Sequence, residues 1–176
     1  MKNIVIVTKG TNTLRYSINT DTNKVSKTWV DPVISGNKND TRINSLSAIV
    51  KTLKQVNEID AANTEPITIY GINLVNDLVK SGTPLLWLHN GGKKMDDSEV
   101  DKVELELWDE FYTLYQANIR RVIFKDQTTI SNVVKSGRSR YGITTEAQNV
   151  AKYINAAWEE VNAKTAQLEE VETDCI

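Results

Sequence analysis

The order in which two hydrophobic periods occur along the chain is the strongest constraint on its fold. Residues 4–7 form a short apolar run, and residues 13–19 alternate apolar with polar side chains. Both patterns are typical of β-strands, and a turn sequence at 21–23 separates them from a third strand-like segment at 24–30. The beginning of the chain therefore predicts an antiparallel meander of three strands.

Apolar residues then recur mainly at helical spacing, with two further strand-like runs between the helical segments. After a loop at 31–40 the sequence predicts a helix at 41–58, a strand at 67–72, short helices at 73–80 and 85–89, a long helix from Asp97 or Ser98 to 118, a strand at 119–124, a long basic loop at 125–143, and a last helix at 145–170. A helix between the third and fourth strands allows a right-handed crossover and parallel pairing. We therefore expect an α/β fold with a mixed five-stranded sheet, in which three antiparallel strands are followed by parallel ones and helices cover both faces.

The length of the chain suits one domain with a substantial core. It has 176 residues, and we expect a single domain at 1–170 followed by a frayed acidic tail at 171–176. No apolar run approaches the roughly 18 residues that a membrane span needs, and the first residues do not form a signal peptide. We therefore expect a cytoplasmic protein with no membrane partner.

The scarcity of thiols and imidazoles removes several kinds of chemistry. The chain has one cysteine, Cys175, and one histidine, His89, which excludes a disulfide framework, a multi-thiolate zinc site and a histidine-paired metal site. Neither glycine-rich nucleotide-binding motif occurs, and the acids at 96–101 lack the spacing of a calcium loop, so we expect no cofactor. Those acids are instead typical of a helix start, where the helix dipole favours negative charge.

The small net charge of −2 conceals strong segregation along the sequence. Residues 118–142 hold six basic residues and one acid, whereas residues 96–110 hold eight acids and one lysine. Residues 143–176 hold seven acids against two lysines. A near-neutral total is therefore compatible with an anion-binding face, although solvated surface is the simpler interpretation of any single charged run.

Three local strings, in this order, resemble type I ribonuclease H. They are Thr41–Val50, which is similar to the family's first-helix segment; Trp87-Leu88-His89-Asn90 with Lys93-Lys94, which resembles the start of its basic protrusion; and Leu107-Trp108-Asp109-Glu110-Phe111, which resembles its long helix. The resemblance covers roughly residues 2–158, and it implies the same fold class as the hydrophobic pattern.

The resemblance does not extend to the family's catalytic residues. That family cleaves the RNA strand of an RNA–DNA hybrid with two divalent metal ions held by four carboxylates. In this frame the four positions are occupied by Lys9, Asn44, Ile72 and Asn149, and the family's loop histidine corresponds loosely to Gln127. All four carboxylates are absent, and a shift of one residue does not restore them.

Two divalent ions a few ångströms apart require several anionic oxygens, both to offset their repulsion and to position the attacking water. The stretches 4–20 and 66–76 contain no Asp or Glu at all. We therefore expect no metal site and no hybrid cleavage, which makes the chain a pseudoenzyme of the ribonuclease H type.

Loss of the carboxylates leaves basic residues as candidates for phosphate contacts. A protein that keeps the binding face without the metals would bind a duplex, an RNA–DNA hybrid or RNA without cutting it. The candidate nucleic-acid-binding residues are Lys9, Lys93, Lys94, Lys135, Arg138, Arg140 and Tyr141, the last as a base-stacking group.

A protein partner is the alternative that the sequence leaves open. The acidic segments 96–110 and 158–174 would suit a basic partner, or would imitate the charge of nucleic acid. The chain would then be an interaction module or an inhibitor that docks on a nucleic-acid-handling complex. Residual enzymatic activity is a third option, and the sequence does not indicate an oligomeric state.

Overall fold

The computed structural model describes residues 2–33, 40–59, 65–127 and 145–174. Its elements, in chain order, are β1 (Lys2–Lys9), β2 (Asn12–Asn19), β3 (Lys24–Val30), α1 (Asp40–Ile59), β4 (Ile67–Gly71), α2 (Asn73–Ser81), α3 (Thr83–His89), α4 (Lys102–Ala117), β5 (Val122–Asp126) and α6 (Thr145–Asp174). This order confirms the predicted α/β class.

The strands form one mixed sheet in the order β3-β2-β1-β4-β5. β1 and β2 pair antiparallel, as do β2 and β3, which confirms the meander. β4 pairs parallel with both β1 and β5. The first strand of the chain therefore lies at the centre of the sheet.

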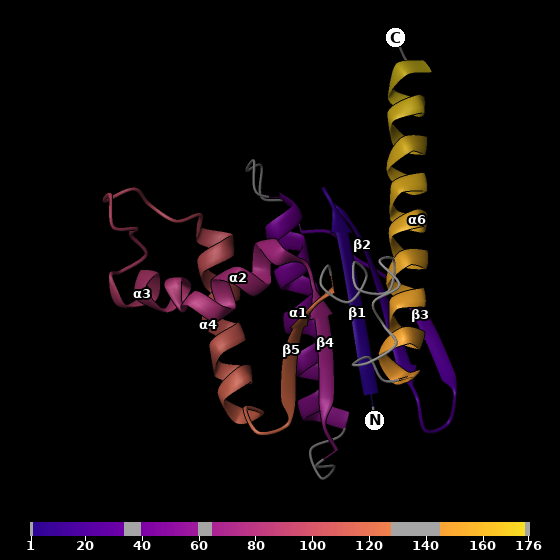
Figure 1. Ribbon diagram of the computed structural model, residues 1–176. Helices are drawn as coiled ribbons and strands as arrows, with labels where there is room; N and C mark the ends of the chain where they lie inside the picture. The colour runs from indigo at the N-terminus through magenta and orange to yellow at the C-terminus, as the bar shows by residue number, and fades with distance from the viewer. Residues whose placement is uncertain (1, 34–39, 60–64, 128–144, 175–176) are drawn as a thin grey trace.

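Helices cover the two faces of the sheet separately. Figure 1 shows α1, α2, α3 and α4 on one side of the strands and α6 alone on the other. The central strand β1 is buried from both sides, since Ile4 and Ile6 belong to the core beneath α1 while Val5 and Val7 belong to the core beneath α6. This double burial explains why residues 4–7 form a continuous apolar run.

The larger core lies between the sheet, α1 and α4. Trp108 and Phe111 of α4 are fully buried there, with their ring centroids 5.4 Å apart in an edge-to-face arrangement. Phe111 also stacks on Tyr115 at 5.6 Å and approaches Phe124 of β5 at 5.7 Å. This aromatic cluster fixes α4 against α1 and the sheet edge.

The long helix α4 begins later than the sequence predicts. The predicted start at Asp97 or Ser98 was wrong, because Asp101 is the capping residue and its carboxylate accepts from the backbone N–H groups of Val103 and Glu104 at 2.9 and 3.2 Å. The preceding acids belong to a turn in which the backbones of Lys93 and Glu99 form an isolated antiparallel β-bridge and Asp97 has a positive φ of 63°. Several neighbouring acids can cap a helix equally well, so the sequence could not choose among them.

Two other boundaries differ from the prediction by three residues or more. The fifth strand is Val122–Asp126 rather than 119–124, so the first residues of the predicted basic loop belong to β5. The last helix continues to Asp174, past its predicted end at 170, while the fraying of the tail stays a prediction. Among the described residues, no helix combines the length and apolarity needed to cross a bilayer.

Candidate site at the carboxyl ends of the parallel strands

A pocket of about 230 Å³ lies at the carboxyl ends of β1, β4 and β5, which we call the carboxyl-end pocket. Ligands of open α/β sheets commonly bind outside the carboxyl ends of the strands, so this is the first place to look for function. The residues that line it are hydroxyl, amide and apolar side chains: Thr8, Thr41, Ile72, Asn73, Leu74, Gln127 and Trp158.

The turn that follows β1 joins this strand to the start of α1. Gly10 has a positive φ of 62°, which glycine adopts without strain, and its backbone N–H donates to the Thr41 hydroxyl at 2.9 Å. The Thr8 hydroxyl lies 3.1 Å from that of Thr13 on β2. Both threonines at the pocket thus already have a partner within the protein.

Gln127 closes the base of the pocket. Its side chain is 2% exposed, and its amide nitrogen donates to the backbone carbonyls of Ile6 at 2.9 Å and Tyr70 at 3.4 Å. Its amide oxygen accepts from the Trp158 indole N–H at 2.7 Å. One side chain therefore joins β1, β4 and α6 just past the point where β1 and β4 cease to pair, and all its polar atoms are satisfied.

One carboxylate lies next to the pocket. Asp126 ends β5, and the side-chain nitrogen of Asn73, with the amide oriented to donate, lies 2.7 Å from one of its oxygens. Among the described residues, no group of three or more His, Cys, Asp or Glu side chains could hold a metal ion. The described lining offers hydrogen bonds and apolar contact to a ligand rather than the anionic oxygens of a two-metal site.

The four positions that match the family's carboxylates do not come together. Ile72 lines the pocket, but Lys9 is exposed on the α6 side of β1, where its ammonium lies 3.5 Å from the Asn162 side-chain oxygen. Thr8, one residue earlier, is the β1 residue at the pocket. Lys9, the residue that the resemblance matches to the first-strand carboxylate, does not line this pocket.

Asn44 has a structural role in the connection between β3 and α1. It is 2% exposed; its side-chain oxygen accepts from the Val33 N–H at 2.7 Å and its nitrogen donates to the Asp40 carbonyl at 2.9 Å. The residue of α1 at the pocket is Thr41, nearly one turn earlier. Asn44 is buried in this connection and does not line the pocket.

Asn149 lies at the opposite end of the sheet. It lines a separate pocket with Asn19, Asn23 and Lys152, close to the amino end of β1. The α6 residue at the carboxyl-end pocket is instead Trp158. The sequence shows which side of α6 is apolar, but the apolar pattern repeats along the helix and does not fix its position along the sheet.

Lys93 and Lys94 belong to the segment between α3 and α4, and Figure 1 shows both helices on the side of the sheet opposite α6. They precede α4, and the Lys94 ammonium lies 5.4 Å from the centre of the Trp87 ring. The starts of α1 and α4 are joined by Arg42, whose guanidinium donates to both oxygens of Glu104 at 2.6 and 2.7 Å.

The other predicted phosphate contacts cannot be placed. Lys135, Arg138, Arg140 and Tyr141 lie outside the described residues, so their role stays a prediction from the sequence. Neither a scan against protein-family models nor a search of curated proteins finds a match to this chain. The resemblance to ribonuclease H therefore depends on the strings quoted above and on the topology.

Proposed function

We propose that this chain is a ribonuclease H-like domain that binds nucleic acid without cleaving it. The meander followed by parallel strands, with helices on both faces, agrees with the fold that the resemblance implies. The lining of the carboxyl-end pocket supports the non-catalytic part of the proposal. Its described residues are hydroxyl, amide and apolar side chains, whereas a two-metal site needs several carboxylates.

The candidate phosphate contacts in this proposal are Lys9 at the end of β1, on the α6 side of the sheet, and Lys93 and Lys94 before α4, on the other side. The first turns of α1 and α4 are joined by Arg42 and Glu104, and the positive end of a helix dipole favours phosphate. Acids in the turn before α4, among them Asp96 and Asp97, reduce the positive potential there. We therefore expect modest affinity that falls steeply with salt.

Fluorescence anisotropy with a labelled RNA–DNA hybrid, a DNA duplex and single-stranded RNA at two salt concentrations tests the proposal. The double variant Lys93→Gln/Lys94→Gln should reduce the slope of log affinity against log salt by about 1 to 2. Lys24→Gln, at the opposite end of the sheet, is the matched control and should leave the slope unchanged. Absence of binding at micromolar protein and low salt, or equal losses in both variants, would contradict the proposal.

Cleavage is tested separately with the same hybrid. Addition of Mg²⁺ or Mn²⁺ to the wild-type chain should produce no shortened RNA strand. Cleavage that survives purification and disappears in the Asp126→Asn variant would show that the carboxylate next to the pocket supports metal chemistry, and would overturn the non-catalytic part of the proposal.

A protein partner is the second candidate, favoured by an exposed apolar surface on α2 and α3. Leu74, Leu85 and Leu86 are 55, 39 and 55% exposed. Exposed leucines that gather on neighbouring helices are typical of docking surfaces. The double variant Leu85→Ser/Leu86→Ser should then lose a co-purifying protein while nucleic-acid binding is unchanged. If the variant still retains the co-purifying protein, this candidate is removed.

A further inference from the structure

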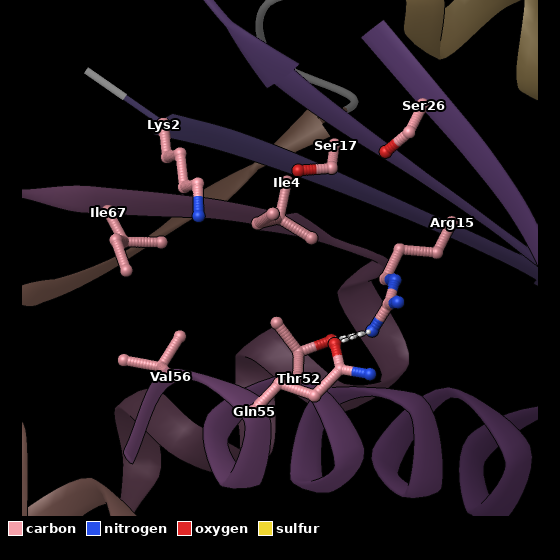
Figure 2. A pocket seen from close by; sticks show the side chains of 9 residues that line it. All are labelled: Lys2, Ile4, Arg15, Ser17, Ser26, Thr52, Gln55, Val56 and Ile67. Carbon is pink, nitrogen blue, oxygen red and sulfur yellow. Dashed lines mark hydrogen bonds between the residues drawn. The ribbon is translucent and has the colours of Figure 1, made fainter. Parts of the chain in front are cut away.

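A second pocket, of about 200 Å³, lies between the sheet and α1 near the amino end of β1. Figure 2 shows Lys2 and Arg15 reaching from the strands toward α1 on two sides of it. We call it the basic pocket, and its polar lining residues are Lys2, Arg15, Ser17, Ser26, Thr52 and Gln55.

The alternation of β2 explains why a polar pocket forms here. Leu14, Tyr16 and Ile18 point into the core beneath α6, so Arg15 and Ser17 point to the α1 side. Ser26 of β3 is paired with Ser17 in the sheet and extends the same polar strip. The α1 side of the outer strands is therefore polar, in contrast to the apolar centre of the sheet.

Arg15 is held in place by neutral partners. One of its terminal nitrogens donates to the Thr52 hydroxyl at 3.2 Å and to the Gln55 side-chain oxygen at 2.9 Å. The Thr52 hydroxyl in turn donates to the Ala48 carbonyl at 2.8 Å, which fixes its orientation. A guanidinium has five N–H donors, so most of the donors of Arg15 are not used by these two bonds.

The lining of the pocket has positive charge without negative charge. Lys2 and Arg15 are its charged members, and no Asp or Glu occurs among the nine described residues that line it. Arg15 is partly withdrawn from water, and this burial lowers the pKa of its guanidinium. The remaining N–H donors of the half-buried Arg15 guanidinium attract an anion, and partial desolvation strengthens that attraction.

We propose that the basic pocket binds the phosphoryl group of a small phosphomonoester. A guanidinium fork matches the oxygens of a phosphoryl group, and an ammonium and two serine hydroxyls supply further donors. This number of donors suits three terminal oxygens better than the two of a carboxylate. Ile4, Val56 and Ile67 form the apolar part of the lining, against which the organic portion of the ligand packs.

This site is independent of the proposed nucleic-acid surface. Lys2 pairs with Asn19 and Ile67 at the amino end of β1, whereas Lys9 and the carboxyl-end pocket lie at the other end. A phosphodiester backbone shares the phosphoryl chemistry but lacks the terminal dianionic group. Binding of monoester and oligonucleotide should therefore be separable by mutation.

The test is a two-dimensional amide NMR titration of the full chain with inorganic phosphate, phenyl phosphate and phenylacetate. The two phosphates should give saturable shifts in β2 and the second half of α1, with phenyl phosphate the tighter of the two. Phenylacetate should bind at least about tenfold more weakly, since it offers fewer oxygens. Equal affinity for phenylacetate, or no saturable shift with either phosphate, would overturn the proposal.

Two variants and one control distinguish a loss of phosphate affinity from a loss of folding. Gln55→Glu places a carboxylate beside Arg15, which should preserve folding while it reduces phosphate affinity about tenfold or more, and Arg15→Gln should do the same. Gln116→Glu makes the same chemical change on exposed α4 and should have no effect. Unchanged affinity in folded Gln55→Glu would contradict the site. Competition of a single-stranded oligonucleotide for the same shifts would assign the pocket to nucleic acid instead and overturn the monoester proposal.

Discussion

The carboxyl-end pocket and the basic pocket differ in how their polar groups are satisfied. In the first, Gln127 uses all its polar atoms on Ile6, Tyr70 and Trp158. In the second, Arg15 meets only neutral acceptors and keeps most of its donors for other partners. The side chains of the pocket whose location suggests function thus mainly stabilise the fold, whereas the pocket in which Arg15 keeps unused donors lies where the fold gives no expectation of a site.

Loss of the Arg42–Glu104 ion pair, which joins α1 and α4 at the carboxyl end of the sheet, should change the unfolding free energy more than any other substitution considered. Its side chains are 19 and 2% exposed, so Arg42→Met leaves a buried carboxylate without its cation and should cost about 3–5 kcal/mol of unfolding free energy in urea. Lys54→Met breaks the exposed Lys54–Glu110 pair and should cost less than about 1 kcal/mol. Equal costs would show that α1 and α4 are not held together by this pair.

Gln127→Leu tests the base of the same pocket. The substitution replaces the amide by an apolar side chain of similar size and leaves two carbonyls and the Trp158 N–H without this partner, which should cost about 2–3 kcal/mol. Gln116→Leu, on exposed α4, should change the unfolding free energy by less than about 0.5 kcal/mol. A loss below 1 kcal/mol in Gln127→Leu would mean that water replaces the amide, and the contrast between the two pockets would weaken.

Tyr16→Phe tests whether α6 is held independently of the pocket it helps to line. The Tyr16 hydroxyl donates to Glu160 at 2.7 Å, so its removal should cost about 1 kcal/mol at neutral pH. Burial, with the hydrogen bond to Glu160 and its charge, raises the pKa of Tyr16 to about 12.

The sign of the pH dependence follows from that shift. A pKa above the unfolded value of about 10 means that the stabilisation is complete below pH 10 and is lost as pH rises toward 12. Urea unfolding at pH 8 and pH 11 should therefore show the wild type losing part of its advantage over Tyr16→Phe. A constant difference between the two proteins would contradict this contact.

Arg15→Met should have the smallest effect on stability. Loss of two neutral hydrogen bonds is offset because the half-buried guanidinium no longer has to be desolvated, so the unfolding free energy should change by less than about 1 kcal/mol in either direction. Urea unfolding without added phosphate measures it. A loss above 2 kcal/mol would make Arg15 a structural residue and remove the distinction between the pockets.

The spacing of apolar residues was sufficient to predict the class of fold and the mixed sheet. It did not show which residues of the central strand point to each side of the sheet. In β1 both Ile4 and Val5 are buried, so no alternation shows on which side the residues after them lie. The position of Lys9 was inferred from the resemblance alone, and the strand pattern could not show that Thr8 is the residue at the pocket. Strand parity can be inferred from sequence only where one face is exposed.

The basic pocket was missed for a different reason. Arg15 and Ser17 are visible as the polar half of the alternation in β2, and Thr52 and Gln55 lie on α1 beside its apolar stripe. The sequence contains these four residues but not the packing of α1 against the strands, which decides that they face one another. A polar strip on a half-covered strand is the signal that would have indicated it.

The position of α6 has a consequence for the synthesis of this protein. Val5, Val7 and Leu14 are covered by Val150, Ile154 and Val161, yet β2 ends at Asn19 and α6 begins at Thr145. At a ribosomal rate of about 5–20 residues per second, the apolar face of β1 and β2 stays exposed for on the order of ten seconds before α6 is synthesised. Nascent chains therefore expose the apolar face of the β1–β2 hairpin through most of translation. Chains terminated before α6 should be bound by chaperones or aggregate.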